Sequence, residues 1–108
     1  MKFRLLVVDD EKNIRQGLAA ALELDGHEVV TAADGDEGWR RFQKGDIDLV
    51  VTDLRMPGLS GEELLKRIGT ESPGVPVLVL TGHGTVENAV EAMRNRAFDF
   101  LHKPLNLD

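Results

Sequence analysis

The sequence contains no cysteine, which excludes disulfide bonds and thiolate metal sites and is compatible with a reducing, cytoplasmic location. Long apolar runs are missing too, and none approaches the ~18 residues of a membrane span. The apolar run after Met1-Lys2 is too short to resemble a signal peptide. Basic residues are scarce, with 13 Lys and Arg against 19 Asp and Glu. The net charge of −6 argues against direct contact with nucleic acid, which needs clustered cations.

What the 108 residues do contain is a strict alternation of strand and helix patterns. Short apolar runs predict strands at residues 3–8, 28–32, 49–53, 76–81 and 98–101. Helical spacing predicts helices from residue 12 to a stop at 25–26, from 34 to 44–45, over 62–68 and over 85–94. Such alternation predicts one doubly wound α/β domain with a parallel sheet and right-handed crossovers.

Acidic side chains collect where the first and third strands are expected to end. Asp9 and Asp10 follow the first strand directly, and Asp53 ends the third just before a Pro57-Gly58 turn. Parallel sheets place their ligands beyond the carboxyl ends of their strands, so we expect these three carboxylates to lie together. Two plainer interpretations remain open: Asp10 could cap the following helix, and Asp53 could simply end its strand in a turn.

Three neighbouring carboxylates repel one another, and either a bound proton or a hard cation relieves that repulsion. Oxygen ligands suit Mg²⁺, with Mn²⁺ as a substitute. The expected ends of the fourth and fifth strands add Thr81 and Lys103 to the same place. A metal ion and the Lys103 ammonium would neutralise a phosphoryl group as an Asp53 oxygen attacks it, and Thr81 would donate a hydrogen bond to it.

From Phe3 to Asp108 the sequence resembles the receiver domains of bacterial two-component response regulators. The segments that carry the resemblance are Val8-Asp9-Asp10-Glu11, Thr52-Asp53-Leu54-Arg55-Met56-Pro57-Gly58, Thr81-Gly82 and Lys103-Pro104. Thr81-Gly82-His83-Gly84, with residues 97–101, is most similar to the nitrogen-regulator subfamily. The resemblance implies a flavodoxin-like five-stranded sheet of order 2-1-3-4-5, in a single receiver domain (residues 1–108) at the start of a longer regulator.

The resemblance also implies a role for each site residue. Asp53 would accept a phosphoryl group from a sensor histidine kinase, with Lys103 and Thr81 beside it. The Mg²⁺ ligands would be Asp9, Asp10, Asp53 and the backbone carbonyl of Arg55. The chain would catalyse only its own phosphorylation and slow dephosphorylation, so we do not expect it to be an enzyme.

Signalling would depend on two further sets of residues. By the same resemblance, Thr81 and Phe100 would change conformation and pass the signal to an output domain, a partner protein or a second copy, in transcription regulation. Arg55 and His83 each follow a site residue by two positions. We expect them to flank the path of water to the acyl phosphate and to tune its lifetime.

The chain departs from the family pattern at two places. Arg96 stands where the family usually has Gly, and of the family's fifth helix only Asn106-Leu107-Asp108 is present, so we expect bare apolar surface there. Two rival functions stay open. One is a receiver-like interaction module that is never phosphorylated; the other is a small Mg²⁺-dependent aspartyl-phosphate phosphatase, which would need a second Asp where Arg55 stands.

Overall fold

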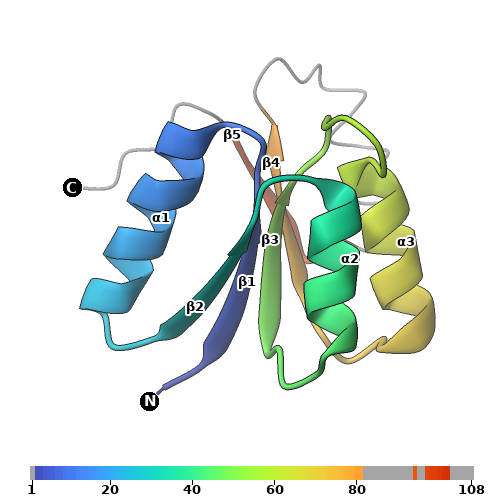
Figure 1. Cartoon of the computed structure of the whole chain (residues 1–108). Coiled ribbons are helices and arrows are strands. Elements are labelled where there is room, and N and C mark those ends of the chain that lie inside the picture. Colours follow the sequence, from blue (N-terminus) through green and yellow to red (C-terminus); the bar gives the residue numbers. More distant parts are fainter. Residues whose placement is uncertain (1, 82–93, 95–96, 103–108) are drawn as a thin grey trace.

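The computed structural model describes residues 2–81, 94 and 97–102. Its strands are β1 (Arg4–Val8), β2 (Glu28–Ala32), β3 (Leu49–Asp53), β4 (Val77–Thr81) and β5 (Asp99–His102). The helices within the described residues are α1 (Lys12–Leu24), α2 (Gly35–Gln43) and α3 (Gly61–Glu71) (Figure 1). Strand and helix alternate in chain order from β1 to β4, as the sequence pattern predicts.

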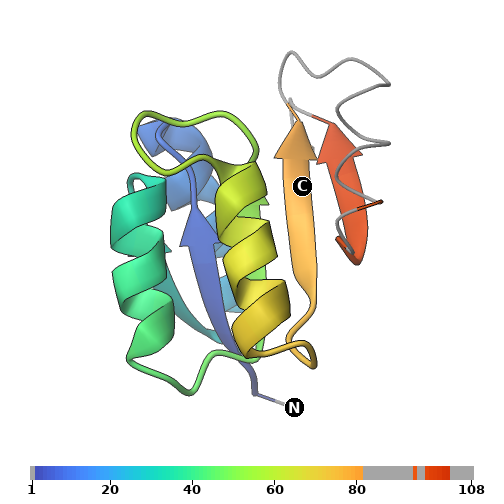
Figure 2. The ribbon, with the colours of Figure 1, turned by 90° about the vertical axis from the view of Figure 1, so that its right-hand side faces the viewer.

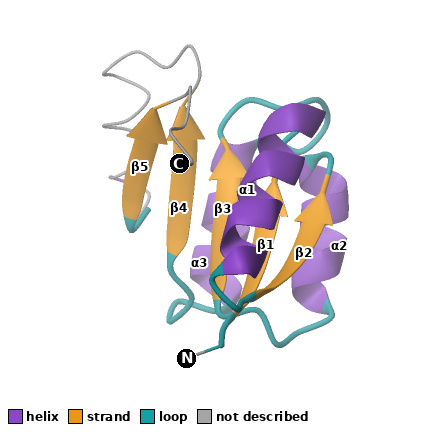
Figure 3. Ribbon diagram, turned by 90° about the vertical axis from the view of Figure 1, so that its left-hand side faces the viewer, coloured by secondary structure: helices purple, strands orange, loops and turns teal. Residues whose placement is uncertain are grey.

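All five strands run parallel in the order β2-β1-β3-β4-β5, and their arrows point the same way in Figure 3. This is the strand order that the family resemblance implies. β1 and β3 are therefore neighbours, with Val8 in register with Thr52. We call the edge of the sheet where the strands end the carboxyl edge, and the opposite edge the amino edge. The residues after β1 and at the end of β3 meet at the carboxyl edge.

Two layers of helices cover the sheet, with α2 and α3 on one face and α1 on the other (Figures 1 and 2). Alternation along β1 explains both layers, because Leu6 and Val8 belong to the core under α2 and α3, while Val7 belongs to the core under α1. Both cores are apolar, and Leu6, Val7 and Val8 have no exposed surface. The sheet is thus buried on both sides of its central strands, as parallel sheets require.

Helix starts agree with the sequence at α2 and α3 but correct one interpretation at α1. Asp34 caps α2 by accepting from the Glu37 N–H at 2.8 Å, and Ser60 caps α3 by accepting from the Glu63 N–H at 3.2 Å. The residue preceding α1 is Glu11, with no side-chain cap, so Asp10 does not cap the helix. Its carboxylate stays available for another use.

Several elements differ from the predicted bounds. β1 and β4 each begin one residue later than predicted. α3 extends to Glu71, past the predicted end at residue 68, and the backbone hydrogen bonding continues to the bond from the Ser72 N–H to the Ile68 carbonyl at 2.7 Å. β5 occupies 99–102, one residue later than predicted. The predicted helix over 85–94, Arg96 and the expectation about the fifth helix lie outside the described residues, apart from Arg94.

Candidate functional site

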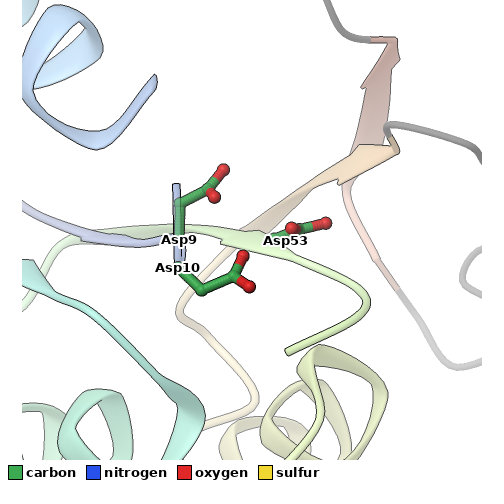
Figure 4. A group of neighbouring side chains, drawn as sticks. All are labelled: Asp9, Asp10 and Asp53. Atoms are coloured by element: carbon green, nitrogen blue, oxygen red, sulfur yellow. The ribbon is translucent and has the colours of Figure 1, made fainter. Parts of the chain in front are cut away.

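Three carboxylates meet at the carboxyl edge, where the sequence predicts them. Asp9 and Asp10 follow β1 and Asp53 ends β3, and one oxygen from each lies within 4.8 Å of the others. Figure 4 shows the three side chains extending to the same side of the strands. Their proximity follows from the sheet, because β1 and β3 are adjacent and parallel and end together.

Burial differs sharply among these three acids. Asp9 has no exposed surface and Asp53 is 7% exposed, whereas Asp10 is exposed to solvent. Charges repel more strongly when little water screens them, so the Asp9 and Asp53 carboxylates carry most of the electrostatic cost of the cluster. A cation placed among the three would relieve this repulsion, and the relief would contribute to its binding free energy.

Asp9 is held by one hydrogen bond to the end of β2 and one within the β1–α1 turn. Its backbone N–H donates to the Ala32 carbonyl at 3.1 Å, which continues the pairing of β1 with β2 by one residue. Its Oδ1 accepts from the Glu11 N–H at 2.9 Å. Because the side chain is fixed in this way, its carboxylate needs little reorganisation to bind a ligand.

Asp53 is positioned by the close approach of α3 to the end of β3. The Gly61 N–H donates to the Leu54 carbonyl at 2.9 Å, and the Thr52 hydroxyl donates to the Asp53 carbonyl at 3.0 Å. Any Cβ on Gly61 would overlap the Asp53 carbonyl, so only glycine permits this approach. Asp53 therefore projects from a strand end whose backbone is fixed on both sides.

The donor set fits a hard divalent cation. All three side chains offer carboxylate oxygens, which Mg²⁺ and Mn²⁺ prefer. One oxygen from each side chain lies within 4.8 Å of the others, so the three are close enough together to serve as ligands of one ion.

The other predicted site residues lie at the carboxyl edge, within β5 or outside the described residues. Thr81 ends β4 next to β3, and Phe100 lies in β5 in register with Val79. Arg55 is exposed in the loop after β3. Lys103 and His83 are not among the described residues, so their roles stay predictions.

One contact at this edge was not predicted from the sequence. The Arg15 guanidinium of α1 donates from Nη1 to the backbone carbonyl of Asp9 at 2.9 Å. It thereby brings a positive charge next to the acidic cluster. The available signal was spacing, because Arg15 lies one helical turn after Glu11 and so above the β1–α1 turn.

Comparisons with known proteins agree with this fold. Residues 5–108 match the family described as the response regulator receiver domain. Among curated proteins, the transcriptional regulatory protein GlrR of Escherichia coli K12 is 41% identical over 104 residues, which cover 96% of this chain and 23% of GlrR. The chain therefore belongs to the response regulator receiver domain family.

Two solved structures are similar over nearly the whole chain. A response regulator receiver domain protein from Clostridium thermocellum gives a TM-score of 0.91 at 44% identity, covering 97% of this chain and 85% of that one. NtrX from Brucella abortus, in complex with ADP, gives 0.93 at 40% identity, covering 100% of this chain and 25% of that one. The chain thus spans about a quarter of the length of NtrX and of GlrR.

Within the described part of the chain, no helix has the length and apolar character needed to cross a membrane.

Proposed function

We propose that this domain is a phosphorylation-activated switch in which Asp53 accepts a phosphoryl group from a sensor histidine kinase. One observation carries the proposal: Asp9, Asp10 and Asp53 gather at the carboxyl edge within 4.8 Å. In this proposal Asp9, Asp10, Asp53 and the Arg55 carbonyl hold Mg²⁺. When bound, the ion supplies positive charge beside the transferred phosphoryl group.

The chain's own residues perform the transfer. A carboxylate oxygen of Asp53 attacks phosphorus, the new oxygen–phosphorus bond forms as the phosphorus–nitrogen bond to the kinase histidine breaks, and the imidazole leaves with the electron pair. The Lys103 ammonium pairs with the negative charge on the phosphoryl oxygens, and the Thr81 hydroxyl donates a hydrogen bond to one of them. These groups act by charge and position.

The phosphoryl charge then shifts the domain between two conformations through Thr81 and Phe100. The altered surface signals to an output domain or partner protein of a longer, cytoplasmic transcription regulator, or pairs with a second copy. Arg55 and His83 tune how fast water removes the phosphoryl group. Such a domain acts on no other substrate.

Labelling with a small phosphodonor tests the proposal. With Mg²⁺ and acetyl phosphate, mass spectrometry should show one added phosphoryl group, located on Asp53 and lost in acid. Asp53→Asn should abolish labelling while keeping the fold, since the amide is nearly isosteric with the carboxyl group. Asp46→Asn, at the opposite edge, should label normally.

Each contrary outcome points to a different function. Labelling of the Asp53→Asn variant to the same extent would end the assignment of the phosphoacceptor. No labelling of the unaltered domain, by acetyl phosphate or by phosphorylated kinases, would favour an interaction module that works without phosphorylation. A small phosphatase is not favoured, because the second acid it needs is replaced by Arg55.

A further inference from the structure

The loop between β3 and α3, residues 54–60, is fastened to the first turn of α2. The Leu59 N–H donates to Oδ2 of Asp36 at 3.2 Å. Figure 2 shows this loop curving over the N-terminal end of α2 before α3 begins. Asp36 itself is exposed, so its contact with the loop does not arise from burial in the core.

Glycines on both sides make this contact possible. Gly58 has a φ of +73°, which disfavours other residues, and a Cβ there would overlap Oδ2 of Asp36. Gly35, the first residue of α2, packs so closely on Leu59 that a Cβ would overlap the Leu59 carbonyl. Loop and helix therefore approach at two points, and Asp36 supplies the side-chain hydrogen bond between them.

The first turn of α2 is a firm support for this bond. Asp34 accepts from the Glu37 N–H at 2.8 Å, and Glu37 in return accepts from the Ala33 N–H at 2.7 Å. This arrangement is similar to a capping box, with the return bond made to the residue before the cap, and it fixes the start of the helix. The Asp36 side chain thus starts from a backbone that has little freedom.

At its other end the loop is tied to α3 by the bond from the Gly61 N–H to the Leu54 carbonyl. Between the two ties lie the exposed residues Arg55, Pro57 and Gly58 and the half-buried Met56. Fixing Leu59 therefore restricts the conformations open to the Arg55 backbone, which follows Asp53 by two residues.

We propose that Asp36 is a positioning residue for the metal site: by holding Leu59, it keeps the Arg55 carbonyl in place to bind Mg²⁺. The inference rests on the proposed function, in which that carbonyl is a ligand. A purely structural alternative is that Asp36 only adds a negative charge to the first turn of α2, where such charges are favourable.

Glu62 provides a matched control for that alternative. It is the second residue of α3, as Asp36 is the second residue of α2, and both helices begin with a buried glycine. Replacing either acid by alanine removes one negative charge from a first helical turn. Only Asp36 has a hydrogen bond to the loop recorded in the structure.

Four proteins test the proposal: the unaltered domain, Asp36→Ala, Asp36→Asn and Glu62→Ala. Calorimetry measures Mg²⁺ affinity, and amide hydrogen exchange of Leu59 in metal-free protein reports the loop. We expect Asp36→Ala to raise the Mg²⁺ dissociation constant about fivefold, the change that corresponds to the free energy of one hydrogen bond. Amide hydrogen exchange of Leu59 should become faster. Asp36→Asn keeps an acceptor oxygen and should stay close to the unaltered domain, as should Glu62→Ala.

Labelling of Asp53 by acetyl phosphate over a range of Mg²⁺ concentrations separates positioning from general damage. Asp36→Ala should need about fivefold more Mg²⁺ for half its maximal rate and should reach the normal rate at saturation. Equal losses in Asp36→Ala and Asp36→Asn, or faster Leu59 exchange with unchanged Mg²⁺ affinity, would overturn the inference. Failure of the proposed function shows separately, as absence of Mg²⁺-dependent labelling in the unaltered domain.

Discussion

The two edges of the sheet differ in the signs of the charged side chains that lie close together there. At the amino edge, acids meet bases: Glu28 pairs with Arg4 at 3.4 Å and with Lys2 at 4.0 Å. Asp48 there accepts from the Arg4 N–H at 2.8 Å. At the carboxyl edge, by contrast, three carboxylates of one sign meet, those of Asp9, Asp10 and Asp53. The Arg15 guanidinium beside them donates to a backbone carbonyl.

This difference separates what stabilises the domain from what serves its chemistry. Exposed opposite charges contribute little individually, because solvent screens them and ordering the side chains costs entropy, but they do not repel. Repulsion within a cluster of acids, two of them buried, opposes folding, and a bound cation would relieve it. Under the proposed function, the carboxyl edge therefore trades stability for metal and phosphoryl binding, and the amino edge makes no such trade.

The largest expected effect is on the free energy of unfolding, when a glycine at one end of α3 or the other is replaced by alanine. Gly61→Ala would drive a methyl group into the Asp53 carbonyl and should destabilise the domain by about 2–3 kcal/mol, the upper range for overpacking. Gly69, two residues before α3 ends, has no neighbour within 4 Å of the Cβ position. Gly69→Ala should stabilise the domain by about 0.5–1 kcal/mol, because alanine restricts the unfolded chain more.

Urea unfolding of both variants measures these free energies, and Asp53 labelling shows the consequence at the site. Only Gly61→Ala should also slow labelling, since α3 must move away from the end of β3. Equal and small changes in the two variants would mean that the approach of α3 to Asp53 is looser than the structure shows.

An effect of intermediate size on stability is expected when one charge is removed from the acidic cluster. Without Mg²⁺, Asp53→Asn should raise the free energy of unfolding by about 1 kcal/mol, or the melting temperature by about 4–8 °C, because it relieves repulsion in a buried site. Saturating Mg²⁺ should stabilise the unaltered domain and should stabilise the variant less. Thermal melting with and without Mg²⁺ tests both statements.

Asp46→Asn, which removes a charge at the amino edge, is the control for the change in net charge. Its residue has a φ of +65°, which asparagine tolerates as well as aspartate does. A rise in melting temperature as large as that of Asp53→Asn would attribute the effect to net charge and not to the cluster.

Much of the fold follows from the sequence, because each strand is a short apolar run bounded by turn residues. The bounds of β2 agree with the prediction, and β5 differs by one residue. Strand alternation and parallel pairing place Asp9 and Asp53 at the same edge of the sheet. The strand order that makes β1 and β3 neighbours came from the family resemblance and is confirmed.

Contacts that depend on the path of a loop were not predictable in this way. The bonds from Arg15 to the Asp9 carbonyl and from Leu59 to Asp36 join segments whose relative placement no periodicity encodes. The contrast in burial between Asp9 and Asp10 has the same origin, since it depends on how the chain turns after β1. These features affect how firmly the site residues are held more than whether they come together.

The smallest expected effect lies at the amino edge. Glu28→Gln removes the ion pairs to Arg4 and Lys2, whose side chains are 38% and 70% exposed, and should lower the free energy of unfolding by only about 0.5 kcal/mol. The difference from the unaltered domain should vanish in 1 M salt, where the screening length is ~3 Å. Mg²⁺ affinity and Asp53 labelling should not change, because Glu28 begins β2 and the acidic cluster lies beyond the opposite end of the sheet.

Urea unfolding at low and high salt measures the change in stability and its salt dependence, and calorimetry measures the Mg²⁺ affinity. A loss above about 2 kcal/mol, or an altered Mg²⁺ affinity, would show that the two edges are coupled through the sheet and that charge at one cannot be changed independently of the other.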